Sequence, residues 1–222
     1  MNNEIEGIVL SSIDYKESSK IVYLYTNIGN ISVKALKSKK IKGGDLGFIT
    51  TGNIVSFVIT NNEFPTLIEY HLKESLFDLS YDIKKLNALS IILSLLKNIP
   101  DDSPHNLIYP LVSKYISELK NKNEKKILAI ILIKLLYAFG VNPILKECIK
   151  CKGKDVIDFI PRVGGALCSN CTNHKSETLK YWKYYYYQKE DIETYPDCDF
   201  DLLLNEIKIY YQFHLSIKIN LL

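Results

Sequence analysis

Four of the five cysteines form two pairs with the spacing of a metal site. Cys148 and Cys151 make one C-x2-C pair, and Cys168 and Cys171 make a second pair after a gap of 16 residues, 152–167. This spacing is typical of a four-thiolate zinc site, in which each pair directs two sulfurs to one side of a tight turn. Four thiolates complete a tetrahedral shell and leave no open position for water. We therefore expect one Zn²⁺ ion with a structural role.

Other uses of these cysteines fit the sequence less well. The first 20 residues carry no secretory signal, so we expect a cytoplasmic protein in which disulfides are disfavoured. A redox motif normally needs one C-x2-C pair, not two. Iron in place of zinc stays open, because spacing alone does not distinguish the two metals. His174 is a rival ligand for which a surface position is expected, and Cys198 is expected to lie outside the site.

The first third of the chain predicts a small β-barrel. Five short segments are rich in β-branched and aromatic residues. These are Glu4–Leu10, Ile21–Tyr25, Ile31–Ala35, Ile54–Ile59 and Leu67–Leu72. Five strands within about 75 residues are typical of an OB-fold, a five-stranded barrel.

Beyond Leu76 the apolar residues recur at three- and four-residue spacing, which indicates helices. The first three expected helices are Leu86–Leu96, a second one beginning at Pro110, and Glu124–Phe139. A fourth is capped by Ser176 and buries Trp182 and Tyr186, and the last is capped by Asp199 or Asp201. The third is apolar nearly all round, so it should lie at the centre of a helical core. Its apolar run is too short to cross a bilayer.

The fold class predicted from these patterns is α+β multidomain. An N-terminal OB-fold β-barrel is followed by an all-α helical domain with an embedded four-cysteine zinc module. The expected divisions are an OB-fold DNA-binding domain at 1–76, the first part of the helical domain at 77–145, the zinc-binding module at 146–173 and the C-terminal helical part at 174–222.

A lysine cluster marks the first candidate binding surface. It lies at the end of the third expected strand and in the loop that follows, and consists of Lys34, Lys37, Lys39, Lys40 and Lys42. OB-folds bind single strands across strands 2 and 3 and the neighbouring loops, so we expect these lysines to contact DNA phosphates. A solvated loop in a lysine-rich protein is the alternative. Because Arg162 is the only arginine, a reader of specific DNA bases is not expected.

Aromatic residues supply two further candidates. The segment 181–187 holds five tyrosines and Trp182, which could stack on bases, although an amphipathic helix must also bury one side. We favour the interpretation that these aromatic residues belong to the core. Tyrosines that point away from the core would be the informative ones for base stacking. Tyr23 and Tyr25 share one face of the second expected strand, either a DNA platform or the barrel interior.

Catalytic motifs are missing from the sequence. The four histidines are scattered, and there is no H-E-x-x-H, G-x-S-x-G or G-x4-G-K-[ST] pattern. We therefore expect a protein that binds and positions its partners and is not an enzyme.

The ordered set of motifs resembles the RecO family of bacterial recombination mediators. The opening resembles the family's N-terminal signature from Glu6-Gly7 through Asp14-Tyr15 to Ile31-Ser32. Gly164-Gly165-Ala166-Leu167-Cys168 is similar to the segment before its second cysteine pair, and the run 211–215 followed by Lys218 is similar to its C-terminal helix.

The resemblance implies a function in DNA repair and homologous recombination. RecO-like proteins bind single- and double-stranded DNA, anneal complementary strands and act with RecR. They help RecA replace single-strand-binding protein. The resemblance thus implies DNA, RecR and single-strand-binding protein as partners, RecA as an indirect partner, no membrane, and a nucleoid-associated location. It does not identify the surfaces involved or the oligomeric state.

Two rival functions stay open at this point. One is an RNA- or transcription-associated protein that combines an OB-fold with a zinc ribbon. The other is an adaptor that binds proteins through its helical domain and does not bind DNA.

Overall fold

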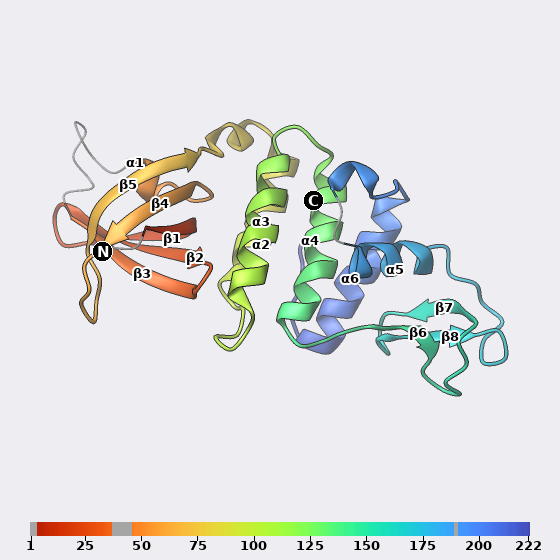
Figure 1. The fold of residues 1–222 in the computed structure, drawn as a ribbon. Coiled ribbons are helices and arrows are strands. Elements are labelled where there is room, and N and C mark those ends of the chain that lie inside the picture. Colours follow the sequence, from red (N-terminus) through yellow and green to blue (C-terminus); the bar gives the residue numbers. More distant parts are fainter. Residues whose placement is uncertain (1–3, 37–45, 189–190) are drawn as a thin grey trace. The chain divides into compact units, whose positions relative to one another are not determined.

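The computed structural model describes residues 4–36, 46–188 and 191–222. The chain divides into two compact units, 1–121 and 122–222. The first holds strands β1–β5 and helices α1–α3, and the second holds strands β6–β8 and helices α4–α6 (Figure 1). The predicted segments 1–76, 77–145, 146–173 and 174–222 do not coincide with these units, and they stay a prediction about how the chain divides.

The first unit contains a closed five-stranded barrel. Its strands are β1 (Ile5–Tyr15), β2 (Ser19–Thr26), β3 (Gly29–Ala35), β4 (Ile54–Ile59) and β5 (Leu67–Glu74). They form one antiparallel sheet in the order β3-β2-β1-β4-β5. A parallel bridge between Lys34 and Thr66 joins the two edges of this sheet, and the Lys34 amide donates to the Pro65 carbonyl at 2.9 Å. This closure confirms the predicted OB-fold.

Alternating residues of the strands fill the barrel. Val9, Val22, Leu24, Val33 and Phe57 point inward and are fully buried. The short helix α1 (Leu46–Ile49), which the sequence patterns did not reveal, places Phe48 against Phe57 with ring centroids 5.4 Å apart. Burying this side chain stabilises the barrel by about 2 kcal/mol.

Two helices complete the first unit. After the short η1 turn (Phe77–Tyr81), the Asp82 carboxylate caps α2 (Ile83–Leu96) by accepting from the amides of Lys84 and Lys85. The next helix, α3 (His105–Glu118), was predicted to begin at Pro110, and that prediction is wrong. Pro104 immediately precedes the helix, and its carbonyl accepts a hydrogen bond from the Ile108 amide. Pro110 therefore lies inside the helix, where it is exposed to solvent.

The second unit is built around α4 (Glu124–Ala138). Ten of its fifteen residues are buried, as its apolar composition predicted. Around it pack α5 (Leu179–Tyr187) and α6 (Phe200–Leu215), with the short η2 turn (Ile192–Thr194) between them. The Tyr211 hydroxyl of α6 donates to the Leu132 carbonyl of α4 at 2.8 Å. Asp199 caps α6, so the first of the two proposed caps is the one used.

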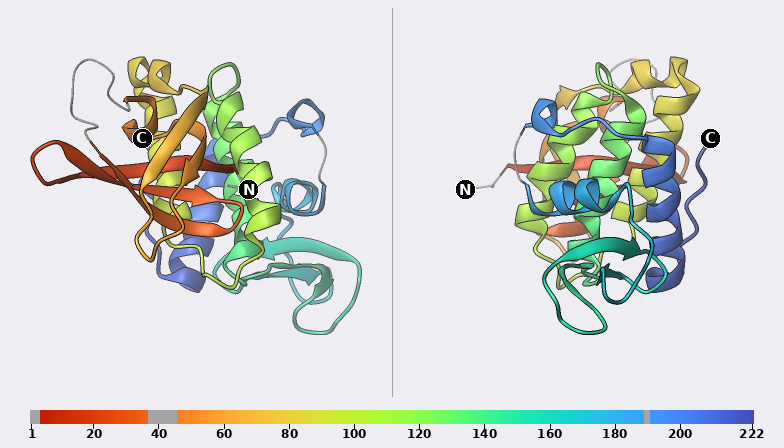
Figure 2. Two further views of the ribbon diagram at one scale, coloured as in Figure 1. Left: turned by 60° about the vertical axis from the view of Figure 1, so that its left-hand side comes forward. Right: turned by 90° about the vertical axis from the view of Figure 1, so that its right-hand side faces the viewer.

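A small second sheet carries the cysteines. It consists of β6 (Ile144–Cys148), β7 (Val156–Ile160) and β8 (Gly165–Cys168) in the order β6-β8-β7. This sheet lies next to α5 (Figure 2). The whole therefore has the predicted α+β class. Among the described residues, no helix is long and apolar enough to span a membrane.

Candidate metal centre and nucleic-acid surface

The two cysteine pairs form turns of the same construction. In the first, the Lys152 amide donates to the Cys148 carbonyl at 2.9 Å, and in the second the Thr172 amide donates to the Cys168 carbonyl at 3.2 Å. Each turn begins at the last residue of a strand, β6 or β8, and these strands are neighbours in the sheet. The sheet therefore brings the two turns together.

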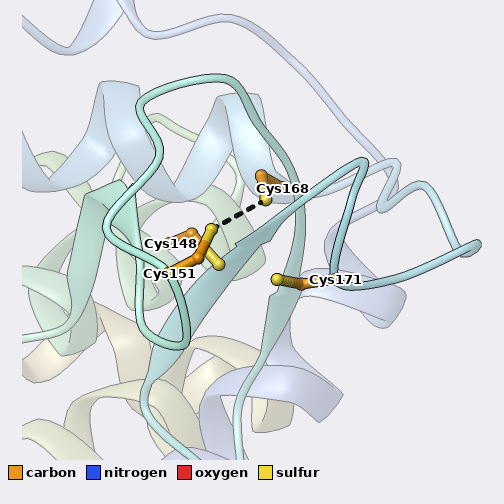
Figure 3. Close-up of side chains that lie close together, drawn as sticks. All are labelled: Cys148, Cys151, Cys168 and Cys171. Carbon is orange, nitrogen blue, oxygen red and sulfur yellow. Dashed lines mark hydrogen bonds between the residues drawn. The ribbon is translucent and has the colours of Figure 1, made fainter.

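The four sulfurs lie close enough together to share one metal ion. Their Sγ atoms all lie within 4.8 Å of one another, and Cys151 and Cys168 are 3.4 Å apart at sulfur (Figure 3). A Zn–S bond of about 2.3 Å in a tetrahedron implies sulfurs about 3.8 Å apart. Cys148, Cys151, Cys168 and Cys171 can therefore hold one metal ion. Among the described residues, no other cluster of three or more His, Cys, Asp or Glu side chains has such geometry.

The thiols influence one another strongly. Burial alone would raise the pKa of Cys148, but backbone hydrogen bonds from Cys151, Cys168 and Lys150 lower it to about 6. The pKa of Cys171 rises to about 12, first through its hydrogen bond with Cys151 and then through burial. Four neighbouring thiolates repel one another, and a divalent cation removes this repulsion. The donor set thus fits a thiolate-binding metal.

Two glycines let the chain reach the second cysteine turn. Gly164 has a φ of +75°, and a Cβ there would lie 2.9 Å from the His214 ring of α6. A Cβ on Gly165 would lie 2.0 Å from Cγ2 of Ile149. His214 also donates from Nε2 to the Pro161 carbonyl at 2.9 Å, which fastens the small sheet to α6. This packing gives a physical reason for the Gly-Gly pair before Cys168.

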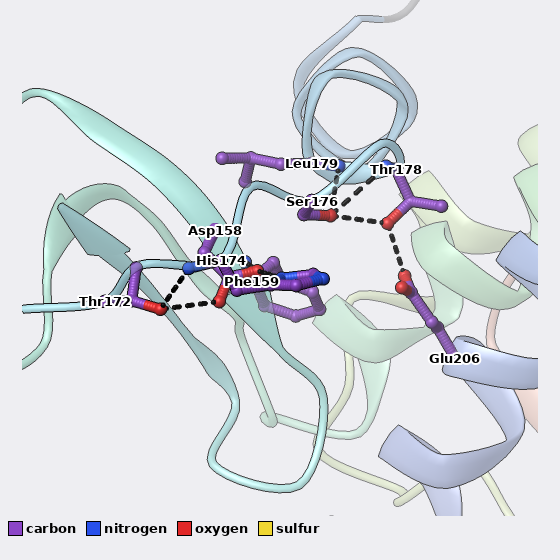
Figure 4. A network of polar contacts seen from close by, with 8 residues as sticks. All are labelled: Asp158, Phe159, Thr172, His174, Ser176, Thr178, Leu179 and Glu206. Carbon is purple, nitrogen blue, oxygen red and sulfur yellow. Dashed lines mark hydrogen bonds and ion pairs between the residues drawn. The ribbon is translucent and has the colours of Figure 1, made fainter. Parts of the chain in front are cut away.

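His174, the rival ligand, lies outside the sulfur cluster. Its Nδ1 is 2.9 Å from the buried carboxylate of Asp158, which also accepts from the Thr172 hydroxyl at 3.3 Å (Figure 4). The hydrogen bond to Asp158 raises the pKa of His174. Cys198 is not part of the cluster either.

A second set of polar contacts joins α5 to α6. The Glu206 carboxylate accepts from the Thr178 hydroxyl at 2.6 Å (Figure 4). It also accepts from Nε1 of Trp182 at 2.8 Å. Burial raises the pKa of Glu206. Ser176 lies two residues before the capping position, and its hydroxyl accepts from the amide of Leu179, the first helical residue. These contacts orient the aromatic helix on the core of the second unit.

The lysine cluster is only partly visible. Lys37, Lys39, Lys40 and Lys42 lie outside the described residues, so the structure does not test their predicted role. Lys34 lies on β3, and its Nζ is 4.3 Å from the centre of the Phe64 ring. Phe64 belongs to the loop between β4 and β5, which OB-folds use for binding. The sequence analysis did not single out Phe64, although an aromatic residue between turn-forming Asn62 and Pro65 was a usable signal.

Tyr25 occupies neither of the positions proposed for it. It is fully buried, but outside the barrel interior, and its hydroxyl lies 3.2 Å from Nδ1 of His105 on α3. Tyr23 on the same face is half-buried and lines a hollow with Asn30, Ser32 and Lys97. The face that carries both residues packs on α3 at Tyr25, so Tyr25 is not available for stacking on DNA.

The aromatic run 181–187 is partly core. Trp182 and Tyr185 are fully buried, and Tyr185 donates to the Pro196 carbonyl at 2.7 Å. The prediction that Tyr186 shares the buried face is wrong. The buried side repeats every three residues from Leu179, which selects Tyr185 and leaves Tyr186 and Tyr187 at the surface side.

Together these features define a class: an OB-fold protein whose second unit is helical and holds a four-cysteine metal site. The family model described as Recombination protein O N terminal matches residues 1–76, and the model described as Recombination protein O C terminal matches residues 80–184. The chain belongs to the RecO family.

Individual relatives agree with this result. The chain is 26% identical over 185 residues to the DNA repair protein RecO of Desulforamulus reducens, covering 80% of this chain and 72% of the relative. It is 27% identical over 187 residues to the protein of that name from Halalkalibacterium halodurans, with 81% and 73% covered. The corresponding protein of Shouchella clausii is 29% identical over 181 residues, with 78% and 69% covered.

Proposed function

We propose that this chain is a DNA repair and recombination mediator that binds single- and double-stranded DNA and anneals complementary strands. Membership of the RecO family gives it a role in DNA repair and recombination, and this observation carries the proposal. With RecR, the protein would help to load RecA onto DNA coated with single-strand-binding protein. It would do so by binding and releasing DNA, without a chemical reaction of its own.

The barrel is the proposed DNA-binding surface. Lys34 and Phe64 combine a positive charge with an aromatic ring beside the loop between β4 and β5. Lys37, Lys39, Lys40 and Lys42 follow β3 in sequence and add four more charges. Lysine suits contacts with phosphates that ignore base sequence, and a half-buried aromatic ring such as that of Phe64 can stack on a base through its accessible side. Neutralising two backbones at once would let complementary strands approach and pair.

The proposed cofactor is one Zn²⁺ ion held by Cys148, Cys151, Cys168 and Cys171. Four thiolates fill its coordination shell, so the ion would stabilise the small sheet and would not bind substrate. Iron would fit the same donors, and metal analysis of the purified protein distinguishes the two ions.

Salt-dependent annealing tests the proposal. The purified protein should anneal complementary oligonucleotides without ATP, and its affinity for single strands should fall steeply with salt. Replacing Lys37, Lys39 and Lys40 with alanine should make the plot of log affinity against log salt shallower by about 2, since three phosphate contacts are lost. The matched control replaces three exposed lysines of the second unit, Lys150, Lys154 and Lys175, and should change the slope much less.

The result also decides between the rival functions. A protein that prefers structured RNA over single-stranded DNA would be an RNA-associated protein instead. A protein that retains no oligonucleotide at low salt would be an adaptor. The finer role is tested by adding RecR and asking whether RecA filaments then form faster on DNA covered by single-strand-binding protein.

A further inference from the structure

Three tyrosines gather at one end of the second unit, apart from the sulfur cluster. Tyr186 and Tyr187 end α5, and their rings meet edge to face with centroids 5.0 Å apart. Tyr137 lies in the last turn of α4, and its hydroxyl is close enough to Tyr186 to contribute to a raised Tyr186 pKa, after burial and Tyr187. Tyr137 is 55% exposed and Tyr187 is 39% exposed. Two large aromatic side chains thus face solvent at the C-terminal ends of α4 and α5.

A lysine stands beside these rings. Ile144 and Lys146 are the outward residues of β6, separated by the buried Leu145. The Lys146 Nζ lies 4.2 Å from the centre of the Tyr187 ring. Lys146 makes no ion pair with any carboxylate in the described part of the chain, so its charge is not neutralised there. We call Tyr137, Ile144, Lys146, Tyr186 and Tyr187 the tyrosine patch.

The same helix carries a second lysine–tyrosine pair in different surroundings. The Lys180 Nζ lies 4.7 Å from the centre of the Tyr181 ring. This pair lines a hollow together with Glu177, Asp199 and Lys175, so two carboxylates offset the two lysines there. Carboxylates next to that pair would repel a phosphate backbone. Of these two lysine–tyrosine pairs, only Lys146 of β6 with Tyr187 of α5 therefore combines a stacking ring with a positive charge that no nearby carboxylate offsets.

We propose that the tyrosine patch binds a single-stranded nucleic acid by stacking bases on Tyr187 and Tyr137 and by contacting phosphate through Lys146. Every base has a π-face, so such binding tolerates any sequence. Tyr186 packs edge to face against the Tyr187 ring, and its hydroxyl donates a hydrogen bond to Asn142. These contacts hold the two rings in place before binding, which reduces the entropy lost on binding. This inference rests on the proposed DNA-binding function and adds to it a contact in the second unit.

Oligonucleotide affinity of single variants tests the patch. In the full-length protein, Tyr187→Ala should weaken binding of an oligo(dT) strand by about fivefold or more, whereas Tyr187→Phe, which keeps the ring, should bind like the wild type. Lys146→Ala should make the salt slope shallower by about 0.7, the value for one phosphate of a single strand. With an oligonucleotide of abasic sites, Tyr187→Ala should bind as well as the wild type, because only stacking is lost.

The Lys180–Tyr181 pair of α5 provides the matched control. Tyr181→Ala and Lys180→Ala remove an equivalent ring and charge from another part of the second unit's surface and should change affinity by less than about twofold. Equal losses from Tyr187→Ala and Tyr181→Ala, or a loss that persists on the abasic strand, would overturn the proposal. Unchanged affinity of Tyr187→Ala for oligo(dT) would also overturn the proposal. So would the finding that the patch binds a peptide but no oligonucleotide.

A cross-linking experiment avoids dependence on a variant's folding. Wild-type protein irradiated with a 5-iodouracil oligonucleotide should yield cross-links to the peptide that contains Tyr186 and Tyr187. Absence of that cross-link, when cross-links to barrel peptides form, would refute the patch and leave the proposed function intact. If the wild type binds no oligonucleotide at all, the proposed function itself fails and the patch fails with it.

Discussion

At the scale of single residues, Tyr25 and His105 show how a polar contact joins the barrel to α3. His105 Nε2 faces the Asp101 carbonyl at 3.2 Å, and a carbonyl can only accept. The ring proton is therefore on Nε2, and Nδ1 accepts from the Tyr25 hydroxyl. Both side chains are buried, so neither group can exchange this bond for one with water.

Removing either partner should destabilise the first unit by different amounts. Tyr25→Phe loses one hydrogen bond and should lower the free energy of unfolding by about 1 kcal/mol. His105→Ala also leaves a cavity and a buried hydroxyl without a partner, so about 2–4 kcal/mol should be lost. Urea unfolding followed by circular dichroism measures both. Tyr23→Phe is the control, since Tyr23 is only half-buried, and its change should stay within about 0.5 kcal/mol.

His174 should make the stability of the second unit depend on pH. Its pKa is raised by the hydrogen bond to Asp158, so the protonated form is favoured in the folded state. This contribution is fully present below the unfolded pKa of about 6.5 and is lost as pH rises through the folded pKa. The difference in unfolding free energy between wild type and His174→Gln should therefore shrink as pH increases from about 5.5 to about 8.5. Unfolding is followed by Trp182 fluorescence at each pH, at a constant excess of metal.

The partner of His174 supplies the control for this prediction. In an Asp158→Asn background the largest cause of the raised pKa is gone, and the effect of His174→Gln should then change much less with pH, through Glu206 and Glu177 alone. A difference between wild type and His174→Gln that grows with pH would contradict the assignment, because it would require a lowered pKa in the folded protein.

At the scale of elements, periodicity predicted what repeats along the chain and missed what depends on tertiary contacts. The five strands and α4 were predictable because their apolar residues recur in the pattern of the structure. The start of α3 was misplaced because proline is common at a first helical position, and Pro104 and Pro110 compete for that role. Tyr25 was misjudged because its burial depends on His105, which is 80 residues away in sequence. Tyr186 was assigned to the buried face that Tyr185 occupies instead. For the site, spacing alone identified the four cysteines, whereas the sequence pattern around Phe64 gives no hint of its contact with Lys34, which depends on the tertiary fold.

The small sheet should depend on its metal ion. Its strands have only five, five and four residues, so its own hydrogen bonds and packing contribute little folding energy. A bound metal supplies the missing folding energy, so a chelator or Cys168→Ser should loosen this sheet. Trp182 is the only tryptophan, and its ring centre is 4.6 Å from that of Phe159 on β7. Its emission should shift to longer wavelength when the metal is lost.

The fifth cysteine gives the control for metal removal. Cys198 lies outside the sulfur cluster, so the Cys198→Ser variant should retain one metal ion per chain and the Trp182 emission of the wild type. Metal content is measured on the same samples. Unchanged Trp182 emission in a protein stripped of metal would show that the sheet is stable without it.

At the scale of the whole molecule, the charge composition determines what kind of binding is possible. The chain has 28 lysines and arginines against 25 acidic residues, and Arg162 is its one arginine. The Arg162 guanidinium lies 5.1 Å from the centre of the Phe213 ring, on which it stacks. Reading of guanine usually depends on bidentate arginine, and each such contact discriminates by about 1–3 kcal/mol. A chain without a second arginine should therefore bind through phosphates and base stacking.

This composition predicts binding that ignores base order. Oligonucleotides of equal length and composition but scrambled sequence should have dissociation constants within about fivefold of one another, less than one bidentate base contact provides. Their affinities should fall in parallel as salt increases, because each strand loses the same phosphate contacts. Arg162→Lys should leave these ratios unchanged. One sequence bound more than about tenfold tighter than its scrambled versions would require specific base contacts, made by side chains such as asparagine or lysine or by backbone groups, and would contradict the inference from charge composition.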